Sequence, residues 1–146
     1  MELIFRTVDP DSDRDVEQFN ELMDQLLCRA YDQDLLRSRI REANANPDKY
    51  LLAAENTDTG ALVGTVLGVC FGDFCETCNP VMSIENVVTH DSVRGKGVAR
   101  AMLAEMEAWG RRKQAVYTNL CSSNHRHEAH QIYKASGYED VRGFRK

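Results

Sequence analysis

The sequence has few prolines, no long apolar run and no excess of positive charge, and each of these absences excludes a class of protein. With 3 prolines and 9 glycines in 146 residues, it contains no obvious linker, internal repeat or low-complexity segment. No apolar stretch approaches the roughly 20 residues that cross a bilayer. The first residues lack the basic start and apolar stretch of a signal peptide. We therefore expect a cytoplasmic protein with no membrane partner.

The net charge is also unlike that of a nucleic-acid-binding domain. The formal value of −5 argues against such a protein, because domains of that kind are usually basic over at least one face. We expect no nucleic-acid partner. Any anionic ligand must be attracted by a local group of cations.

Cysteine is present in an odd number, five, which favours reduced thiols over a framework of disulfides. Cys75 and Cys78 form a single C-x-x-C pair, without the second pair that a zinc site needs. We interpret them as two loop cysteines without a set purpose. A labile disulfide or adventitious metal binding is the alternative, and we expect no dedicated metal site.

The length and the hydrophobic fraction of 42% fit a single domain over residues 1–146. Periodicity and turn residues predict helices after residue 13, from about 34 to before Pro47, over 97–112 and over 126–135. Strands are predicted over 3–8, 50–54, 61–71, 81–89, 115–121 and 138–145. The order β-α-α-β-β-β-α-β-α-β indicates an α/β fold, with a mixed, largely antiparallel sheet and helices on both faces.

A glycine-containing turn opens the predicted helix at 97. A helix N-terminus leaves backbone N–H groups unpaired, and Gly95 and Gly97 allow that backbone to approach a phosphate. Arg94, Lys96 and Arg100 add positive charge at the same point. The turn is neither a Walker A motif nor a Rossmann fingerprint, so nucleotide hydrolysis and NAD binding are disfavoured.

A second block lies about thirty residues further on, and the two blocks together resemble the GCN5-related N-acetyltransferase (GNAT) superfamily. Its acetyl-CoA motif, R/Q-x-x-G-x-G/A, is matched by Arg94, Gly97 and Ala99. Its C-terminal pattern is matched by these residues: Asn124, Ala129, Tyr133, Gly137 and Tyr138. The resemblance covers residues 81–140, and the remainder agrees only in its order of elements.

The resemblance implies acetyl-CoA as co-substrate and a set of residues that bind it. Backbone groups of one strand would bind the pantetheine arm, the turn would hold the pyrophosphate, and Asn124 would touch the cofactor side. The implied binding residues are Val87, Val88, Thr89, Arg94, Gly95, Lys96, Gly97, Val98, Ala99, Arg100 and Asn124. Tyr133 would lie near the thioester sulfur.

Two residues are candidates for proton transfer. An amine substrate must lose a proton before it attacks a thioester, and we assign that base to Glu85, which on a regular strand shares a face with Val87 and Thr89. The segment 84–88 resembles the corresponding strand of glucosamine-phosphate acetyltransferases. Tyr133 is the candidate acid for the departing thiolate. The alternatives are an exposed strand-edge carboxylate and a tyrosine that packs on the core.

Other reactive side chains receive no catalytic role. Direct transfer from acetyl-CoA needs no nucleophilic cysteine, so we interpret Cys121 as structural. His125, His127 and His130 do not form an H-E-x-x-H motif, and we favour cap and surface roles for them, with an alternative base as the second interpretation. The segment from His127 also resembles aminoalkylphosphonate N-acetyltransferases.

The acceptor is not specified by any motif. We expect an enzyme that acetylates a small primary amine. A protein N-terminal or lysine acetyltransferase is the alternative within the same chemistry, and a non-catalytic acyl-CoA-binding regulatory module is the alternative from another class. A homodimer is compatible with the sequence, which contains no signal that decides it.

Overall fold

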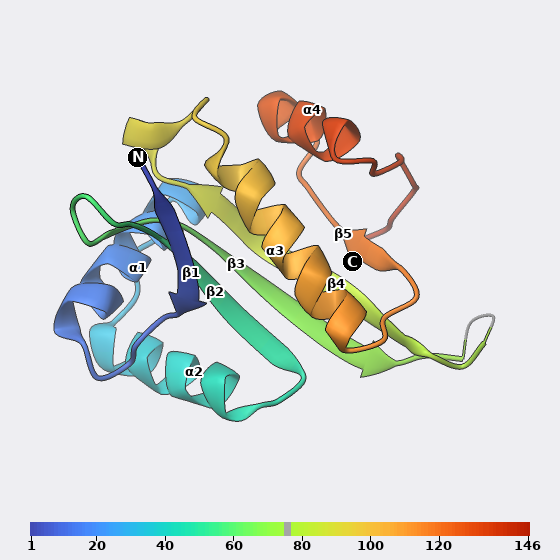
Figure 1. Cartoon of the computed structure of the whole chain (residues 1–146), viewed down its shortest axis with the longest axis horizontal. Helices are drawn as coiled ribbons and strands as arrows, with labels where there is room; N and C mark the ends of the chain where they lie inside the picture. Colours follow the sequence, from blue (N-terminus) through green and yellow to red (C-terminus); the bar gives the residue numbers. More distant parts are fainter. Residues whose placement is uncertain (75–76) are drawn as a thin grey trace.

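The computed structural model describes residues 1–74 and 77–146 and contains a five-stranded sheet with helices on both faces (Figure 1). The strands are β1 (Leu3–Thr7), β2 (Lys49–Asn56), β3 (Ala61–Gly72), β4 (Pro80–Thr89) and β5 (Thr118–Leu120). The helices are α1 (Asp13–Leu27), α2 (Gln33–Ala45), α3 (Val98–Arg112) and α4 (His127–Ala135), with a 3-10 helix, η1, at Asp91–Val93.

The strands follow the order β1-β2-β3-β4-β5 across the sheet. Neighbouring strands are antiparallel except β4 and β5, which are parallel and joined through α3. The predicted mixed, largely antiparallel sheet is confirmed. Within the described residues, no helix combines the length and apolar character that crossing a membrane requires.

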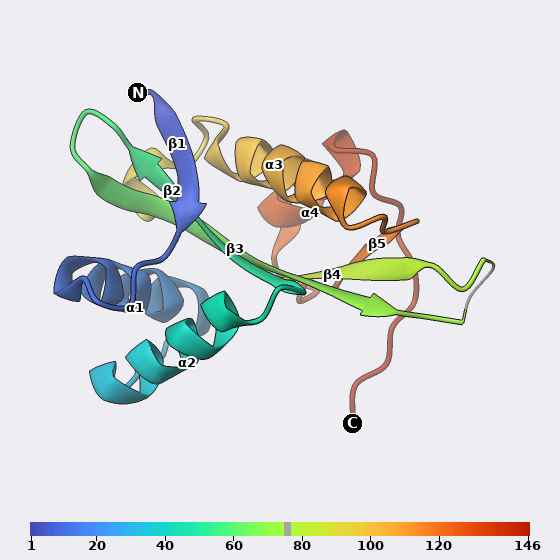
Figure 2. The same ribbon diagram turned by 60° about the horizontal axis from the view of Figure 1, so that its bottom comes forward.

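Helices α1 and α2 cover one face of the sheet, and α3 and α4 lie on the other (Figure 2). The start of α1 is capped by Ser12, whose side chain accepts a hydrogen bond from the Asp15 amide. Val16, Phe19 and Leu22 then recur at helical spacing and are buried against the sheet. This apolar stripe confirms the face that the sequence predicts for α1.

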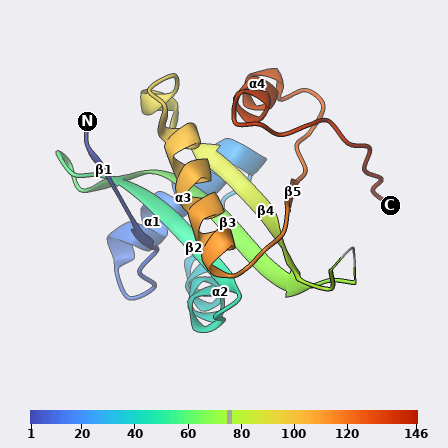
Figure 3. The same ribbon diagram turned by 45° about the vertical axis from the view of Figure 1, so that its right-hand side comes forward.

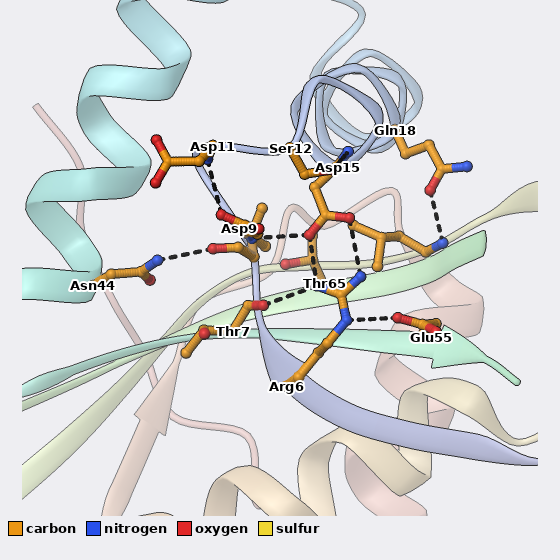
Figure 4. Close-up of polar contacts among 12 residues, drawn as sticks. Arg6, Thr7, Asp9, Asp11, Ser12, Asp15, Gln18, Asn44, Glu55 and Thr65 are labelled. Carbon is orange, nitrogen blue, oxygen red and sulfur yellow. Dashed lines mark hydrogen bonds and ion pairs between the residues drawn. The ribbon is translucent and has the colours of Figure 1, made fainter. Parts of the chain in front are cut away.

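A group of charged side chains ties β1 to α1 and β2 (Figure 4). The Arg6 guanidinium contacts Asp15 at 2.5 Å and Glu55 at 2.5 Å. The Asp15 carboxylate also accepts a hydrogen bond from the Asp9 amide at 2.8 Å. Burial raises the pKa of Asp15, but the hydrogen bonds from Arg6 and Asp9 outweigh it, so that the net pKa lies below its ordinary value.

Helix α3 lies close to β3 because two positions of that strand have no side chain. A Cβ atom at Gly64 would lie 2.8 Å from the Met102 methyl, and one at Gly68 would overlap the Met106 sulfur. Both methionines are fully buried. The close approach that these strand glycines suggest in the sequence is therefore a helix packed on the sheet.

The predicted last strand, 138–145, is wrong: the structure has no strand in this segment. Its apolar residues Tyr138, Val141 and Phe144 are three apart, so a strand could not turn them all to one face. Val141 and Phe144 are 80% and 92% exposed. The preceding strand, predicted over 115–121, is limited to Thr118–Leu120 in the structure.

Candidate active site

Strand β5 pairs with only part of β4. Their parallel register joins Met82 to Thr118 and Ile84 to Leu120, and no further pairs follow among the described residues. Beyond Ile84, residues 85–89 of β4 continue along β3, while the chain after β5 leads to α4 (Figure 3). The backbone of 85–89 thus has a side that no strand occupies in the described part of the chain.

An irregularity in β4 lies at the point where the two strands part. Leu67 of β3 lies opposite Glu85, and Thr65 lies opposite Val88, so two residues of β4 face one residue of β3. Asn86, within this β-bulge, has a φ of 55°. Such a bulge bends its strand and shifts the alternation of side chains by one residue.

The bulge puts Glu85 and Val87 on opposite faces of the sheet. Ile84 and Val87 pack in the core beneath α3, whereas Val88 packs in the core beneath α1 and α2. Glu85 accepts a 2.7 Å hydrogen bond from Ser83, two residues away, and is exposed. Glu85 therefore lies on the face of Val88. The expectation that it shares a face with Val87 is wrong, because regular alternation ends at the bulge.

The glycine turn lies at the far end of β4, where α3 begins. Gly95 and Gly97 have φ values of 76° and 83°, and Gly97 caps α3 without a side-chain hydrogen bond. A Cβ atom on either glycine would contact nothing within 4 Å. The glycines are thus required here for the backbone conformation, and the N-cap residue offers no side chain to the first N–H groups of α3.

The three cations predicted around this turn are in different environments. Arg94 forms a 2.6 Å ion pair with Asp91, with both side chains exposed. Among the described residues, Lys96 and Arg100 have no ion pair. Arg100 lines a shallow hollow of about 190 Å³ between α3 and α4. A second hollow, of about 230 Å³, lies at Tyr31 and Leu35 and touches none of the predicted site residues.

Helix α4 places Tyr133 in the same core as Val87. Tyr133 is 6% exposed, and its ring meets that of Tyr138 at 6.2 Å in an edge-on arrangement. Burial raises the pKa of Tyr133, an effect that the positive charge of Arg126 partly opposes. The Tyr138 hydroxyl donates to Glu107 of α3 at 3.0 Å. These contacts hold α4 against α3.

Other predicted residues are not brought to this point. Asn124 lies exposed in the turn before α4. The His130 ring contacts the Ser123 carbonyl at 3.0 Å and the ring of His127 at 6.1 Å. Within the residues that the structure describes, no group of metal-ligating side chains is present.

The C-x-x-C pair is only partly visible. Cys75 lies outside the described residues, whereas Cys78 is exposed, with its thiol 3.9 Å from the Phe74 carbonyl. Cys121 is exposed and free.

The structure adds two residues that the sequence reasoning missed, Arg126 and Ser122, and shows an unpaired hydroxyl on the predicted Thr89. The guanidinium of Arg126 donates a hydrogen bond to the Val87 carbonyl at 3.2 Å, from α4 to β4. The hydroxyls of Thr89 and Ser122 are buried and lack a partner among the described residues. Arg126 precedes Tyr133 by seven residues, so helical spacing could have placed both on one face. No pattern in the sequence marks Ser122.

Comparison with known proteins agrees with this geometry. The family model described as "Acetyltransferase (GNAT) family" matches residues 16–138. No curated protein matches the chain. A putative acetyltransferase from Agrobacterium tumefaciens is 20% identical, covers 98% of each chain and has a TM-score of 0.85.

Two further similar structures are those of acetyltransferases with a named substrate. The glucosamine-6-phosphate N-acetyltransferase from Arabidopsis thaliana is 18% identical over 100% of this chain and 97% of its own, with a TM-score of 0.86. The aminoglycoside antibiotic 6'-N-acetyltransferase from Acinetobacter baumannii is 17% identical over 99% and 98%, with a TM-score of 0.78. The similarity of fold and the match over most of the sequence have one consequence: this chain belongs to the GNAT acetyltransferase family.

Proposed function

We propose that residues 1–146 form a single acetyltransferase domain that transfers the acetyl group of acetyl-CoA directly to the primary amine of a small molecule. The observation that carries this proposal is the separation of β4 from β5 after Ile84, with the uncapped start of α3 at its far end. An extended chain ending in phosphates matches both features, because free strand backbone binds extended groups and helix N-termini bind anions.

The coenzyme-binding residues follow from this arrangement. Backbone groups of Val87, Val88 and Thr89 bind the pantetheine arm along the free side of β4. The amides of Gly95 to Arg100, including Val98 and Ala99, hold the pyrophosphate, with Arg94, Lys96 and Arg100 supplying charge. Two observations support this fit. The buried Thr89 hydroxyl lacks a partner among the described residues, and no side chain caps α3. Asn124, in its exposed turn, lies at the cofactor's edge in this proposal.

Glu85 and Tyr133 move the protons. Glu85 accepts a proton from the ammonium group, whose pKa is roughly 10 for a lysine-like amine. The freed amine attacks the thioester carbonyl, the attacking nitrogen loses its second proton to water, the carbon–sulfur bond breaks, and its electron pair leaves on sulfur. Tyr133 gives its hydroxyl proton to that sulfur. Free thiol and an N-acetyl product result, and no nucleophilic cysteine is needed.

The face on which Glu85 lies indicates where the acceptor enters. Since Glu85 is on the side of α1 and α2, the amine approaches from that face of the sheet. A small-molecule acceptor is supported by the two structural neighbours named above, an acetyltransferase of glucosamine-6-phosphate and one of aminoglycosides. The net charge of −5 favours cationic acceptors over anionic ones. The free thiols Cys28, Cys70 and Cys121 support a reducing, cytoplasmic location.

The test is thiol release from acetyl-CoA in the presence of small amines and amine-terminated peptides. Turnover with amino sugars or polyamines is the expected result. Turnover with peptides alone would replace the proposal by a protein acetyltransferase. Binding of acetyl-CoA without turnover of any amine would make the chain a non-catalytic acyl-CoA-binding module.

A further inference from the structure

Arg126 is a partly buried cation without an ion-pair partner among the described residues. Its guanidinium reaches from the start of α4 to the backbone of β4, where Nη2 donates to the Val87 carbonyl at 3.2 Å. A surface arginine commonly lies beside a carboxylate, as Arg94 does. A partly buried cation whose described partner is a carbonyl, and not a carboxylate, keeps its charge available for negative charge that develops beside it.

The position of Arg126 indicates where that charge develops. Arg126 and Tyr133 are seven residues apart, two turns of α4, and therefore lie on the same face of the helix. Val87 and Tyr133 belong to the same buried core. The guanidinium thus contacts the strand proposed to hold the pantetheine arm. Burial raises the pKa of Tyr133, and the charge of Arg126 acts on this hydroxyl, proposed to donate a proton, by lowering that pKa.

The other groups around Tyr133 do not supply positive charge. Tyr138 meets its ring edge-on and donates its own proton to Glu107, a carboxylate on α3. His130 of α4 contacts the Ser123 carbonyl. Tyr133 is itself buried, which disfavours its ionised form. Arg126 is therefore the cation available to offset the charge that Tyr133 acquires when it loses its proton.

We propose that Arg126 is a positioning residue for acetyl transfer, which supports Tyr133 as the acid by stabilising the phenolate that remains once its proton has moved to the departing sulfur. The step balances: the carbon–sulfur bond breaks, its electron pair stays on sulfur, sulfur takes the Tyr133 proton, and the negative charge passes to the Tyr133 oxygen. The proton that the attacking nitrogen loses as it becomes an amide returns through water to the phenolate. This role depends on the proposed acid function of Tyr133.

The test is a double-mutant cycle measured with a turned-over amine and saturating acetyl-CoA. Arg126→Gln is expected to lower kcat by about tenfold to a hundredfold, the scale for loss of one electrostatic donor. Arg126→Lys, which keeps the charge, is expected to recover most of that loss. In a Tyr133→Phe background, Arg126→Gln is expected to lower kcat by less than about twofold, because coupled residues are not additive.

A matched control comes from Arg111, an exposed arginine on α3. Arg111→Gln removes the same charge and is expected to leave kcat within about twofold. If Arg126→Gln reduces kcat equally with and without the Tyr133 hydroxyl, Arg126 does not act through Tyr133 and the proposal is overturned. If Tyr133→Phe leaves kcat unchanged, the acid role of Tyr133 fails instead. If Arg126→Gln does not fold, Arg126→Lys is measured in the same cycle. A loss of kcat that is equal with and without the Tyr133 hydroxyl then overturns the role.

Discussion

Glu85 is an exposed carboxylate whose relation to Val87 depends on one additional residue in their strand. Regular alternation would put the two side chains on the same face. The bulge at Asn86 instead turns Val87 to the face of Ile84, beneath α3, so that Glu85 lies on the opposite face, where Ser83 donates a hydrogen bond to it. A base in this place removes a proton from an amine that enters from the side of α1 and α2.

The first prediction concerns Glu85→Gln. We expect kcat/KM at neutral pH to fall by about a hundredfold, the scale of general base catalysis. The deficit should narrow as the pH rises toward the pKa of the amine, because the unprotonated substrate then needs no base. Steady-state rates across this pH range measure both effects.

Glu17→Gln, on the exposed surface of α1, is the control for the loss of one carboxylate and is expected to retain normal rates. An equal activity of Glu85→Gln and the unmodified protein at every pH would assign proton removal to another group.

At the scale of elements, the turn before α3 combines two glycines of positive φ with an uncapped helix start. Any residue with a Cβ atom is strained in this conformation, and Gly60, in the turn between β2 and β3, has the same constraint with a φ of 64°. The two positions differ in two respects: a Cβ atom at Gly60 would lie 3.3 Å from the Arg14 guanidinium, and only Gly97 borders the proposed phosphate site.

We therefore predict different effects for Gly97→Ala and Gly60→Ala. Both should lower the free energy of unfolding by about 1 kcal/mol, since both force an alanine into the left-handed region. Only Gly97→Ala should weaken binding of coenzyme A, by about tenfold, as the amides of the turn move. Calorimetric titration and chemical denaturation measure the two quantities, and equal affinities of both variants would contradict the phosphate assignment.

A second prediction at this scale concerns the charged group that joins β1, α1 and β2. Asp15→Asn leaves the part-buried Arg6 with Glu55 alone, and should lower the free energy of unfolding by about 3 kcal/mol at pH 7. Asp13→Asn, which breaks a 2.7 Å pair of a carboxylate that is 84% exposed, should change it by less than about 1 kcal/mol.

The effect of Asp15 should depend on pH. Because the pKa of Asp15 is lower in the folded protein than its ordinary value of 3.8, its carboxylate stabilises the fold above that value. The contribution is lost as the pH falls below 3.8 and through the folded pKa. Denaturation curves of Asp15→Asn and the unmodified protein should therefore converge in acid, and a difference that stays constant would exclude the ionised pair as the cause.

At the scale of the whole molecule, the residues after α4 contribute little to the packed structure. Val141 and Phe144 are almost fully exposed, and the segment makes no strand. Tyr138, by contrast, packs on Tyr133 and donates to Glu107. The boundary of the packed structure thus lies near residue 138, where the family match also ends.

Deletion of residues 141–146 should therefore change the thermal midpoint by less than about 2 °C. Deletion of residues 137–146, which also removes Tyr138, should lower it by several degrees because α4 loses its contact with α3. Calorimetry of the two shortened chains makes the comparison. A large loss from the shorter deletion would mean that the segment pairs with the sheet after all.

Local patterns in the sequence determined most of the elements. The apolar spacing of α1, the two buried glycines of β3 and the glycine turn before α3 are properties of neighbouring residues, so periodicity and backbone preference identify them. The two motifs that contain the turn and Tyr133 could also be identified from the sequence, because the residues of each motif lie close together in the chain. The last strand was wrong because strand formation requires a partner with which to pair, and apolar residues three apart provide no common face.

Only the tertiary structure decided the parts of the site that depend on how distant segments meet. The bulge that separates the faces of Glu85 and Val87 arises from the register between β3 and β4, and the free side of β4 exists because β5 pairs through three residues only. The hydrogen bond from Arg126 to Val87 joins positions 39 residues apart in the chain. Such relations arise from packing and strand register, which no local preference encodes, whereas the glycine turn and the helical stripes are set by the conformational preferences of the residues themselves.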